Sequence, residues 1–235
     1  MTLTPLGVNG PYPAPRGACS SYLVEYDETS ILLDCGTGAL ARLIMCLDLK
    51  KLDAVLLTHL HFDHMSDMLP MIYALAASGR ASPLPVITPD QPANVRALMN
   101  APALKLTPPA DTQIGPFAIK FMWGRHPVPS YCVSLSTGLE RMVYTGDTNT
   151  QPGLADFADY ADLLLADAGL LSADWHENAP HLSAALCGSL AAEAKVGKLL
   201  LTHLSPKYDP QAILDEARIY FSDAELALAG RAYRI

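Results

Sequence analysis

The chain has 235 residues, 50% of them hydrophobic and 17% charged, and 24 acidic against 16 basic residues give a formal net charge of −8. This length favours one domain with a sizeable core, and the acidic balance without a basic run argues against binding an extended nucleic acid. No apolar run reaches membrane-span length, the amino terminus lacks a signal-peptide pattern, and the five cysteines are scattered. We therefore expect a cytoplasmic protein with reduced thiols and no membrane partner.

Residues 52–58 form a short apolar run without polar alternation, which predicts a buried strand. Directly after it comes His59-Leu60-His61-Phe62-Asp63-His64, which holds three of the seven histidines. Imidazole nitrogens with one or two carboxylates suit zinc and neighbouring metals. We expect His59 and His61 to share one metal ion in the loop that leaves the strand, while Asp63 and His64 turn toward a second.

A helix is predicted after this cluster. Apolar residues recur at helical spacing from Met68 through Ala77, with Ser66 as N-cap and Gly79 as the stop. Ten of the nineteen prolines then fall within 83–129. This proline-rich stretch predicts surface loops and the crossing between two halves of the domain, because apolar residues within it can still pack.

Three further candidate ligands each follow an apolar run that is typical of a strand. The runs and candidates are 117–123 with His126, 142–146 with Asp147, and 198–202 with His203. Ligands collect at the carboxyl ends of strands in α/β sheets, and Gly146 allows the sharp turn that would aim Asp147 inward. Taken alone, Asp147 could equally be a turn former.

Two repeated patterns indicate internal duplication of the single domain 1–235, with halves of about 1–110 and 111–235. The paired stretches are 56–60 with 200–204, identical letter for letter, and 21–24 with 130–133. The second pair leads to Asp34 in one half and Asp147 in the other. Each half would then bring strand-end ligands to a shared seam.

The pattern His59-x-His61-x-Asp63-His64, followed by His126, Asp147 and His203, resembles the metallo-β-lactamase superfamily over essentially the whole chain. The resemblance implies an α/β fold, a four-layer αβ/βα sandwich of two mixed sheets flanked by helices, with the site at one edge between the sheets. The segments 6–10, 146–148 and 180–183 are similar to the ribonuclease Z and phosphodiesterase branch.

This resemblance implies two divalent metal ions. Zinc is the expected metal, and manganese and iron are the alternatives. His59, His61 and His126 would hold one ion, Asp63, His64 and His203 would hold the other, and Asp147 would bridge them. A hydroxide between the ions would attack a phosphodiester, since two cations about 3.5–4 Å apart lower the pKa of water toward about 7 and clamp the attacking and leaving oxygens.

The residues predicted to act in catalysis are His181 and the ligand Asp63. His181 matches the histidine with which this branch protonates the leaving oxygen, which an imidazole can do at neutral pH. Its alternative is an idle, solvated histidine before a helix that Ser183 caps and Gly197 closes.

Supporting roles are predicted for three residues of the amino-terminal segment. Asp34 is expected to orient a ligand histidine through its second ring nitrogen, with a turn role as the alternative. Arg16 and Ser21 are candidate substrate-binding residues. A guanidinium matches phosphate bidentately, although a lone loop arginine is more often a solvated charge.

The chain departs from transfer-RNA-processing ribonuclease Z between His126 and Asp147. That family inserts a long RNA-gripping arm there, but only twenty residues separate the two positions here, and two short strands with a turn at 136–138 use nearly all of them. The predicted substrate is therefore a small or terminal phosphodiester: a cyclic nucleotide, a cyclic phosphate or an RNA end. The resemblance also implies a homodimer, although the sequence reveals no interface.

Other reactions remain open for the same metal frame. It can hydrolyse thioesters, as in glyoxalase II, or lactones and lactams, and ribonuclease Z-like processing of RNA 3′ ends is a further alternative. His181 favours the phosphodiester, because an alkoxide leaving from phosphorus benefits from an acid more than a thiolate does. A non-catalytic metal-binding module would be expected to have lost ligands, and every expected ligand type is present.

Overall fold

The computed structural model describes all 235 residues, whose strands form two seven-stranded sheets. The first sheet has the order β14-β1-β2-β3-β4-β5-β6. Its strands are β1 (Thr2–Gly7), β2 (Ser21–Tyr26), β3 (Thr29–Leu33), β4 (Ala54–Leu56), β5 (Leu84–Ile87), β6 (Leu104–Thr107) and β14 (Tyr233–Arg234). The pairings from β14 to β3 are antiparallel and those from β3 to β6 are parallel, so the sheet is mixed.

The second sheet has the order β13-β12-β11-β10-β9-β8-β7. Its strands are β7 (Thr112–Ile114), β8 (Phe117–Trp123), β9 (Tyr131–Ser136), β10 (Arg141–Tyr144), β11 (Leu163–Asp167), β12 (Leu199–Thr202) and β13 (Glu225–Leu226). It is antiparallel from β7 to β10 and parallel from β10 to β13. The short hairpin β9–β10 fills most of the chain between His126 and Asp147, as predicted, and leaves no room for an inserted arm.

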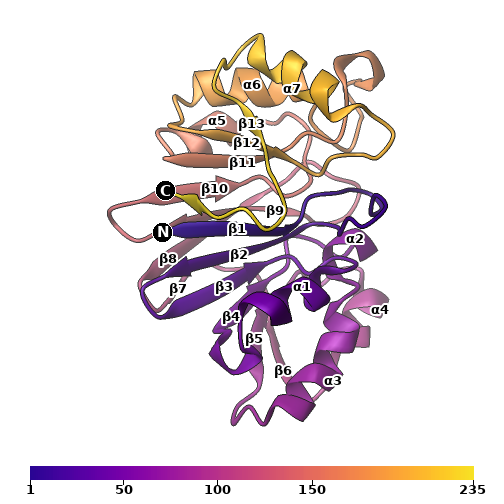
Figure 1. Cartoon of the computed structure of the whole chain (residues 1–235), viewed down its shortest axis with the longest axis vertical. Coiled ribbons are helices and arrows are strands. Elements are labelled where there is room, and N and C mark those ends of the chain that lie inside the picture. Colours follow the sequence, from indigo (N-terminus) through magenta and orange to yellow (C-terminus); the bar gives the residue numbers. More distant parts are fainter.

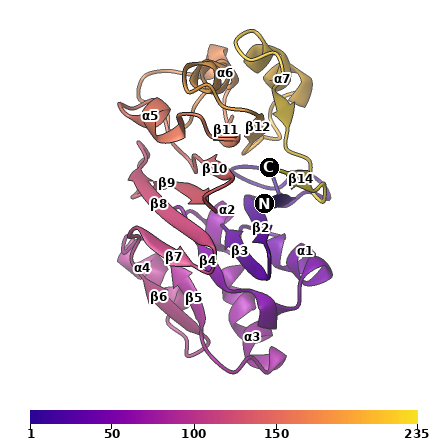
Figure 2. The same ribbon diagram turned by 90° about the vertical axis from the view of Figure 1, so that its left-hand side faces the viewer.

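Helices cover the outer face of each sheet. They are α1 (Ala39–Cys46), α2 (Phe62–Met65), α3 (Met68–Ser78), α4 (Ala93–Arg96), α5 (Leu154–Ala158), α6 (Ala184–Glu193) and α7 (Pro210–Arg218). Figures 1 and 2 show α1, α3 and α4 on the side of the first sheet and α5–α7 at the opposite end, while the short α2 lies at the edge between the sheets. None of these helices has the length and apolarity that crossing a lipid bilayer would require.

Three separate apolar cores hold these layers together. Leu33 of β3, Phe117 of β8 and Leu165 of β11 belong to a core formed by both sheets. A second core joins the first sheet to α1 and α3, and a third joins the second sheet to α5, α6 and α7. Helix, sheet, sheet and helix therefore stack in that order, which confirms the predicted αβ/βα sandwich. Strands such as β11 are buried on both faces, and their sequences are accordingly apolar throughout.

The predicted helix after the histidine cluster is α3, which ends at Gly79 with φ of 75°. Ser66 as its N-cap was wrong, because Ser66 is itself helical and follows directly on α2. Asp67 stands at the N-cap position without capping α3, and its carboxylate accepts a 2.9 Å hydrogen bond from the backbone N–H of Leu40 in α1. The short α2 therefore runs into α3, and Asp67 stabilises the start of a different helix.

Ser183 caps α6 as predicted, since its hydroxyl accepts from the Leu186 backbone N–H at 3.3 Å. The prediction that Gly197 closes this helix was wrong. The helix ends at Glu193, and Lys195, with φ of 51°, occupies the left-handed conformation that reverses the chain. The predicted strand 52–58 is confirmed in place but shortened to β4, because Leu57 and Thr58 already lead into the site.

The order of strands and helices can be compared between the two halves that the repeated patterns predict. The order β2, β3, α1, β4 in one half matches β9, β10, α5, β11 in the other. Equivalent contacts join the strand ends: the Thr58 N–H donates to Asp34 Oδ1 at 2.7 Å, and the Asp167 N–H donates to Thr145 Oγ1 at 2.9 Å. In this register β4 matches β11, whereas the repeat of 56–60, at 200–204, begins within β12 and ends just after it. The identical pentapeptides therefore lie on strands that are not equivalent, displaced by one βα unit. Duplication of the domain stays a prediction, which the topology alone motivates.

The core between the sheets provides a stability test. Leu165 is fully buried there, so Leu165→Ala should lower the free energy of unfolding by about 2–5 kcal/mol, from lost apolar burial and the cavity left behind. Leu139 is 84% exposed, and Leu139→Ala should change that free energy by less than about 0.5 kcal/mol. Urea unfolding of both variants is the measurement, and equal losses would contradict the assignment of this core.

Candidate metal centre

The seven predicted ligands come together where strands of both sheets end, at the edge of the sandwich marked by α2 in Figure 1. Their positions in the chain are His59, His61, Asp63 and His64 after β4, His126 after β8, Asp147 after β10, and His203 after β12. They fall into two groups, each with ligand atoms within 4.8 Å of one another, and Asp147 belongs to both. The loops that leave parallel strands at one edge therefore build the cluster.

The first group joins three imidazoles to Asp147. His61 Nδ1 lies 3.1 Å from His59 Nε2 and 3.0 Å from His126 Nε2, and His59 Nε2 lies 3.5 Å from Asp147 Oδ2. Burial, reinforced for His59 by neighbouring His64, lowers the pKa of His59 and of His126 below the ordinary histidine value. Neutral imidazoles with converging ring nitrogens are the form in which histidine binds a metal.

The second group joins two carboxylates and two imidazoles. His203 Nε2 lies 3.1 Å from Asp63 Oδ2 and 3.4 Å from Asp147 Oδ2, and His64 Nε2 lies 3.2 Å from Asp147 Oδ1. Burial alone would raise the pKa of Asp147, but His203, His64 and His59 hold it well below its usual range. Asp147 is therefore ionised, and its two oxygens face different histidines.

The surroundings of two buried polar atoms indicate whether this set of donors fits a cation. His64 Nε2 and Asp147 Oδ1 are both buried, and although they lie 3.2 Å apart, neither makes a hydrogen bond to the other or to any other group. Such an arrangement costs free energy, because buried polar groups in folded proteins are nearly always satisfied. A divalent cation would accept both as ligands, and three histidines with an aspartate, or two of each, are ordinary zinc donors. The residues present fit a two-metal centre.

The backbone near the cluster adopts conformations that few residues tolerate. Gly146 has φ of 54°, and a Cβ there would meet the Tyr131 carbonyl at 2.9 Å. A Cβ at Gly10 would lie 1.9 Å from the His203 imidazole. Asp34 and His203 also have positive φ, of 57° and 55°, without being glycine. Strain of this kind persists where surrounding contacts fix the chain, and it is common at functional sites.

Hydrogen bonds to the second ring nitrogen orient several of the histidines. As predicted, Asp34 Oδ2 contacts His64 Nδ1 at 2.8 Å, and it also accepts from the Tyr144 hydroxyl at 2.9 Å. His126 Nδ1 donates to the Pro180 carbonyl at 2.9 Å. These partners leave the Nε2 atoms of His64 and His126 facing the cluster, which is how supporting residues set the tautomer and direction of metal ligands.

Asp167 is a site residue that was not predicted from the sequence. It ends β11, is fully buried, and its Oδ2 lies 2.9 Å from His181 Nδ1. Both residues also lie within 4.8 Å of Asp147 and His203. An aspartate directly after the apolar run 163–166 is the same strand-end signal that identified Asp147, so the sequence did contain the clue.

His181 differs electrostatically from the histidines of the first group. Burial alone would lower its pKa, but Asp167 and then Asp147 raise the pKa of His181 to about 9. Its side chain is 15% exposed. With Nδ1 paired to Asp167, Nε2 is the nitrogen that can meet a substrate, and the ring carries a proton at neutral pH.

The remaining candidates lie outside the cluster. Ser21 is buried, and its hydroxyl donates to the Asp34 carbonyl at 2.9 Å, so it supports the Asp34 turn and has no surface to offer a substrate. Arg16 is exposed on the loop after β1, where its carbonyl accepts from Arg42. The structure brings neither side chain into contact with the seven ligands. His176, which had no predicted role, is exposed.

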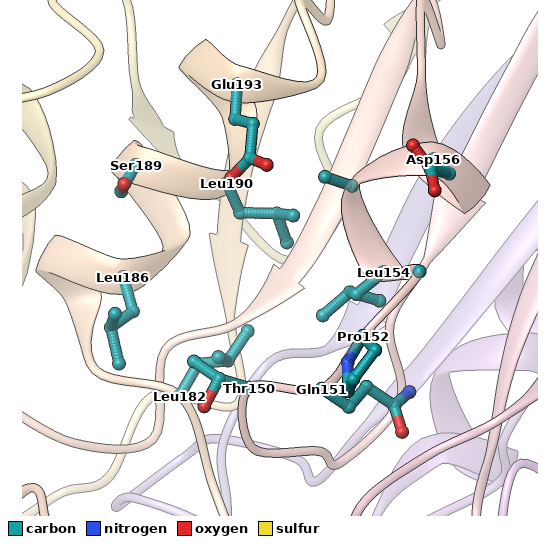
Figure 3. A pocket seen from close by; sticks show the side chains of 12 residues that line it. Thr150, Gln151, Pro152, Leu154, Asp156, Leu182, Leu186, Ser189, Leu190 and Glu193 are labelled. Carbon is teal, nitrogen blue, oxygen red and sulfur yellow. The ribbon is translucent and has the colours of Figure 1, made fainter.

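A cavity of about 250 Å³ lies between α5 and α6. Figure 3 shows Leu154 and Leu190 pointing into the space between these helices, with Asp156 and Glu193 nearby. None of the seven candidate ligands lines it. The cavity contains carboxylates and no cationic side chain, so it is unsuited to binding a phosphate group.

The chain is similar in sequence and in fold to known proteins. Residues 29–204 match the model of the beta-lactamase superfamily domain. The Bacillus subtilis (strain 168) protein named "Probable metallo-hydrolase YhfI" is 32% identical over 212 residues, covering 87% of each chain. The crystal structure of YhfI superposes with a TM-score of 0.93 over 99% of this chain and 98% of that chain.

Ribonuclease Z proteins are also similar. The Bradyrhizobium diazoefficiens ribonuclease Z is 28% identical over 293 residues, covering 97% of each chain. The crystal structure of human tRNase Z, short form, matches with a TM-score of 0.81 at 19% identity, over 100% of this chain and 99% of that chain, and thus supports the fold alone.

The division of the seven ligands into two groups predicts how many zinc ions each variant binds. His61→Ala removes a ligand of the first group only, so it should lower bound zinc from about two ions per chain toward one. Asp147→Asn weakens both groups, and should lower zinc further and abolish the rise in melting temperature that metal produces. Elemental analysis after dialysis is the measurement, with the exposed His176→Ala as matched control. Unchanged zinc content in Asp147→Asn would refute the shared carboxylate.

The contact between Asp34 and His64 predicts an effect on metal affinity without loss of a ligand. Asp34→Asn keeps the side-chain shape but weakens the acceptor that orients His64, so affinity for the ion of the second group should fall about 10–100-fold. Chelator competition measures that affinity. Asp53→Asn, at an aspartate that accepts from the Ser30 backbone N–H, is the control. Equal effects of the two substitutions would contradict an orienting role for Asp34.

Proposed function

Because the chain belongs to the metallo-β-lactamase superfamily, near its ribonuclease Z branch, we propose that it is a two-metal phosphodiesterase acting on a small or terminal phosphodiester. The relatives named as a metallo-hydrolase and as ribonuclease Z support metal-dependent hydrolysis. The choice of a phosphodiester rests on one local observation, which is the pairing of His181 with Asp167 beside the cluster.

His181 and Asp167 form a proton-donating pair. The Asp167 carboxylate at 2.9 Å fixes the His181 ring and keeps it protonated, with its remaining nitrogen free. His181 Nδ1 is also only 3.7 Å from Asp147 Oδ2, so the ring lies at the border of the candidate metal centre. A protonated imidazole at this point can donate to an oxygen that leaves from a phosphorus bound at the cluster.

The roles of the other residues follow from their geometry. His59, His61 and His126 would hold one cation, Asp63, His64 and His203 the other, and Asp147 would contact both. When bound, two such cations activate water and neutralise charge on a phosphoryl oxygen. Asp63 acts as a ligand in this scheme, and zinc is the metal that these donors favour. Asp34 and Pro180 keep His64 and His126 directed inward.

The size and charge of the molecule support a small substrate. The hairpin β9–β10 leaves no arm with which to grip folded RNA, and the net charge of −8 gives no general attraction for a polyphosphate backbone. A cyclic nucleotide, a cyclic phosphate or the last phosphodiester of an RNA end would need contacts only at the cluster. Whether the chain works as a homodimer is a separate proposal that the likeness to ribonuclease Z motivates.

The leaving group gives a direct test of His181. A nucleoside 2′,3′-cyclic phosphate expels an alkoxide and needs a proton, whereas bis(p-nitrophenyl) phosphate expels a nitrophenolate that leaves unaided. We expect His181→Ala to lower kcat/KM for the cyclic substrate by about 10²–10⁴-fold and to lower it less than about tenfold for the nitrophenyl ester. Steady-state rates of the zinc-loaded protein measure both.

His176→Ala is the matched control, because it removes an exposed histidine five residues away and should leave both rates unchanged. Equal losses on the two substrates would refute His181 as the acid. Turnover of a thioester or lactone that does not depend on His181, without phosphodiester turnover, would instead support the carbonyl hydrolases as the functional class.

A further inference from the structure

Asn149, two residues after Asp147, makes an unusual number of hydrogen bonds for one side chain. Its Nδ2 carries two N–H groups and lies within hydrogen-bond distance of three backbone carbonyls, those of His176 at 3.3 Å, Glu177 at 3.0 Å and Ala179 at 2.7 Å, so one N–H is shared. Its Oδ1 accepts from the Trp175 indole N–H at 3.0 Å and from the Thr150 N–H at 2.6 Å. Asn149 is fully buried, so it cannot touch a substrate itself.

The segment 175–180 that these bonds hold has little packing of its own. Residues 176–178 are exposed, and the segment contains no helix or strand. Its one internal backbone hydrogen bond joins the Ala179 N–H to the His176 carbonyl at 2.8 Å. The amide of Asn149 therefore fixes the path of this segment at three of its carbonyls.

Two functional groups sit at the end of this segment. The Pro180 carbonyl accepts from His126 Nδ1 at 2.9 Å and so directs a candidate metal ligand. The next residue is His181, whose ring pairs with Asp167. A shift of the segment by a fraction of an ångström would move the carbonyl and the imidazole together, because no residue separates them in the chain.

We propose that Asn149 is a positioning residue that sets both the direction of His126 and the placement of His181 by clamping segment 175–180. The effect on His126 concerns metal binding and does not depend on which reaction the protein catalyses. The effect on His181 rests on the proposed phosphodiesterase function. Asn149 thereby couples the strand end that supplies Asp147 to the loop that supplies the acid.

The test uses Asn149→Ala and Asn149→Asp in the full-length protein. Asp has nearly the same volume and can still accept from Trp175 and Thr150, but it presents a carboxylate where three carbonyls need a donor. Because a buried carboxylate that faces carbonyl oxygens is itself costly, Trp175→Phe, which removes only the indole N–H that Asn149 Oδ1 accepts from, keeps the test valid if neither Asn149 variant folds. Gln151→Ala is the matched control, since Gln151 lies on the same loop and its amide donates to the Trp123 carbonyl instead.

The first readout is zinc affinity, measured by chelator competition without any substrate. We expect the Asn149 variants to lose about 10–100-fold in affinity for one of two ions, matching the ion lost in His126→Ala, while the other ion keeps its affinity. Equal weakening of both ions, or affinity unchanged for both in a folded variant, would overturn the link from Asn149 to His126.

The second readout is the ratio of kcat/KM for the 2′,3′-cyclic phosphate to that for bis(p-nitrophenyl) phosphate at saturating zinc. The Asn149 variants should lower this ratio at least about tenfold, in the same direction as His181→Ala. A general structural defect would lower both rates together, and an unchanged ratio would overturn the link to His181. If the wild-type protein hydrolyses neither ester, the proposed function fails while the affinity measurement still decides the first link.

Discussion

The buried carboxylate of Asp147 is the contact on which the rest of the site depends. One oxygen lies 3.2 Å from His64, and the other lies 3.5 Å from His59 and 3.4 Å from His203. A buried carboxylate is costly unless cations or hydrogen-bond donors surround it, and here histidines from both halves of the chain converge on it. This requirement explains why Gly146 adopts a left-handed turn just before Asp147, where a Cβ would meet the Tyr131 carbonyl.

The four-layer fold serves this arrangement by bringing strand ends of both sheets to one edge. Each ligand leaves a strand whose interior is fixed by apolar packing, so the rigid part of the molecule determines its direction. The supporting contacts come from equally rigid places, with Asp34 at the end of β3, Asp167 at the end of β11, and Asn149 just after β10. The segment 175–180, which is exposed at residues 176–178, is the exception, and Asn149 holds its path.

Much of this could be predicted from the sequence, for physical reasons that differ between residues. His59, His61, Asp63 and His64 were identifiable because their spacing within one loop already implies convergence. Asp167 carried the same strand-end signal as Asp147 and was overlooked. Asn149 could not be found, because its partners are backbone carbonyls that have no signature in the sequence. The Ser66 cap failed because local capping rules do not show that α2 continues into α3.

We propose that Asp147 joins the two metal ions. Anomalous X-ray diffraction from crystals grown with zinc tests it most directly. We expect two peaks about 3.5–4 Å apart, one among His59, His61 and His126, the other among Asp63, His64 and His203, with an oxygen of Asp147 against each. A single peak, or a second peak held by Asp167 and His181, would contradict it.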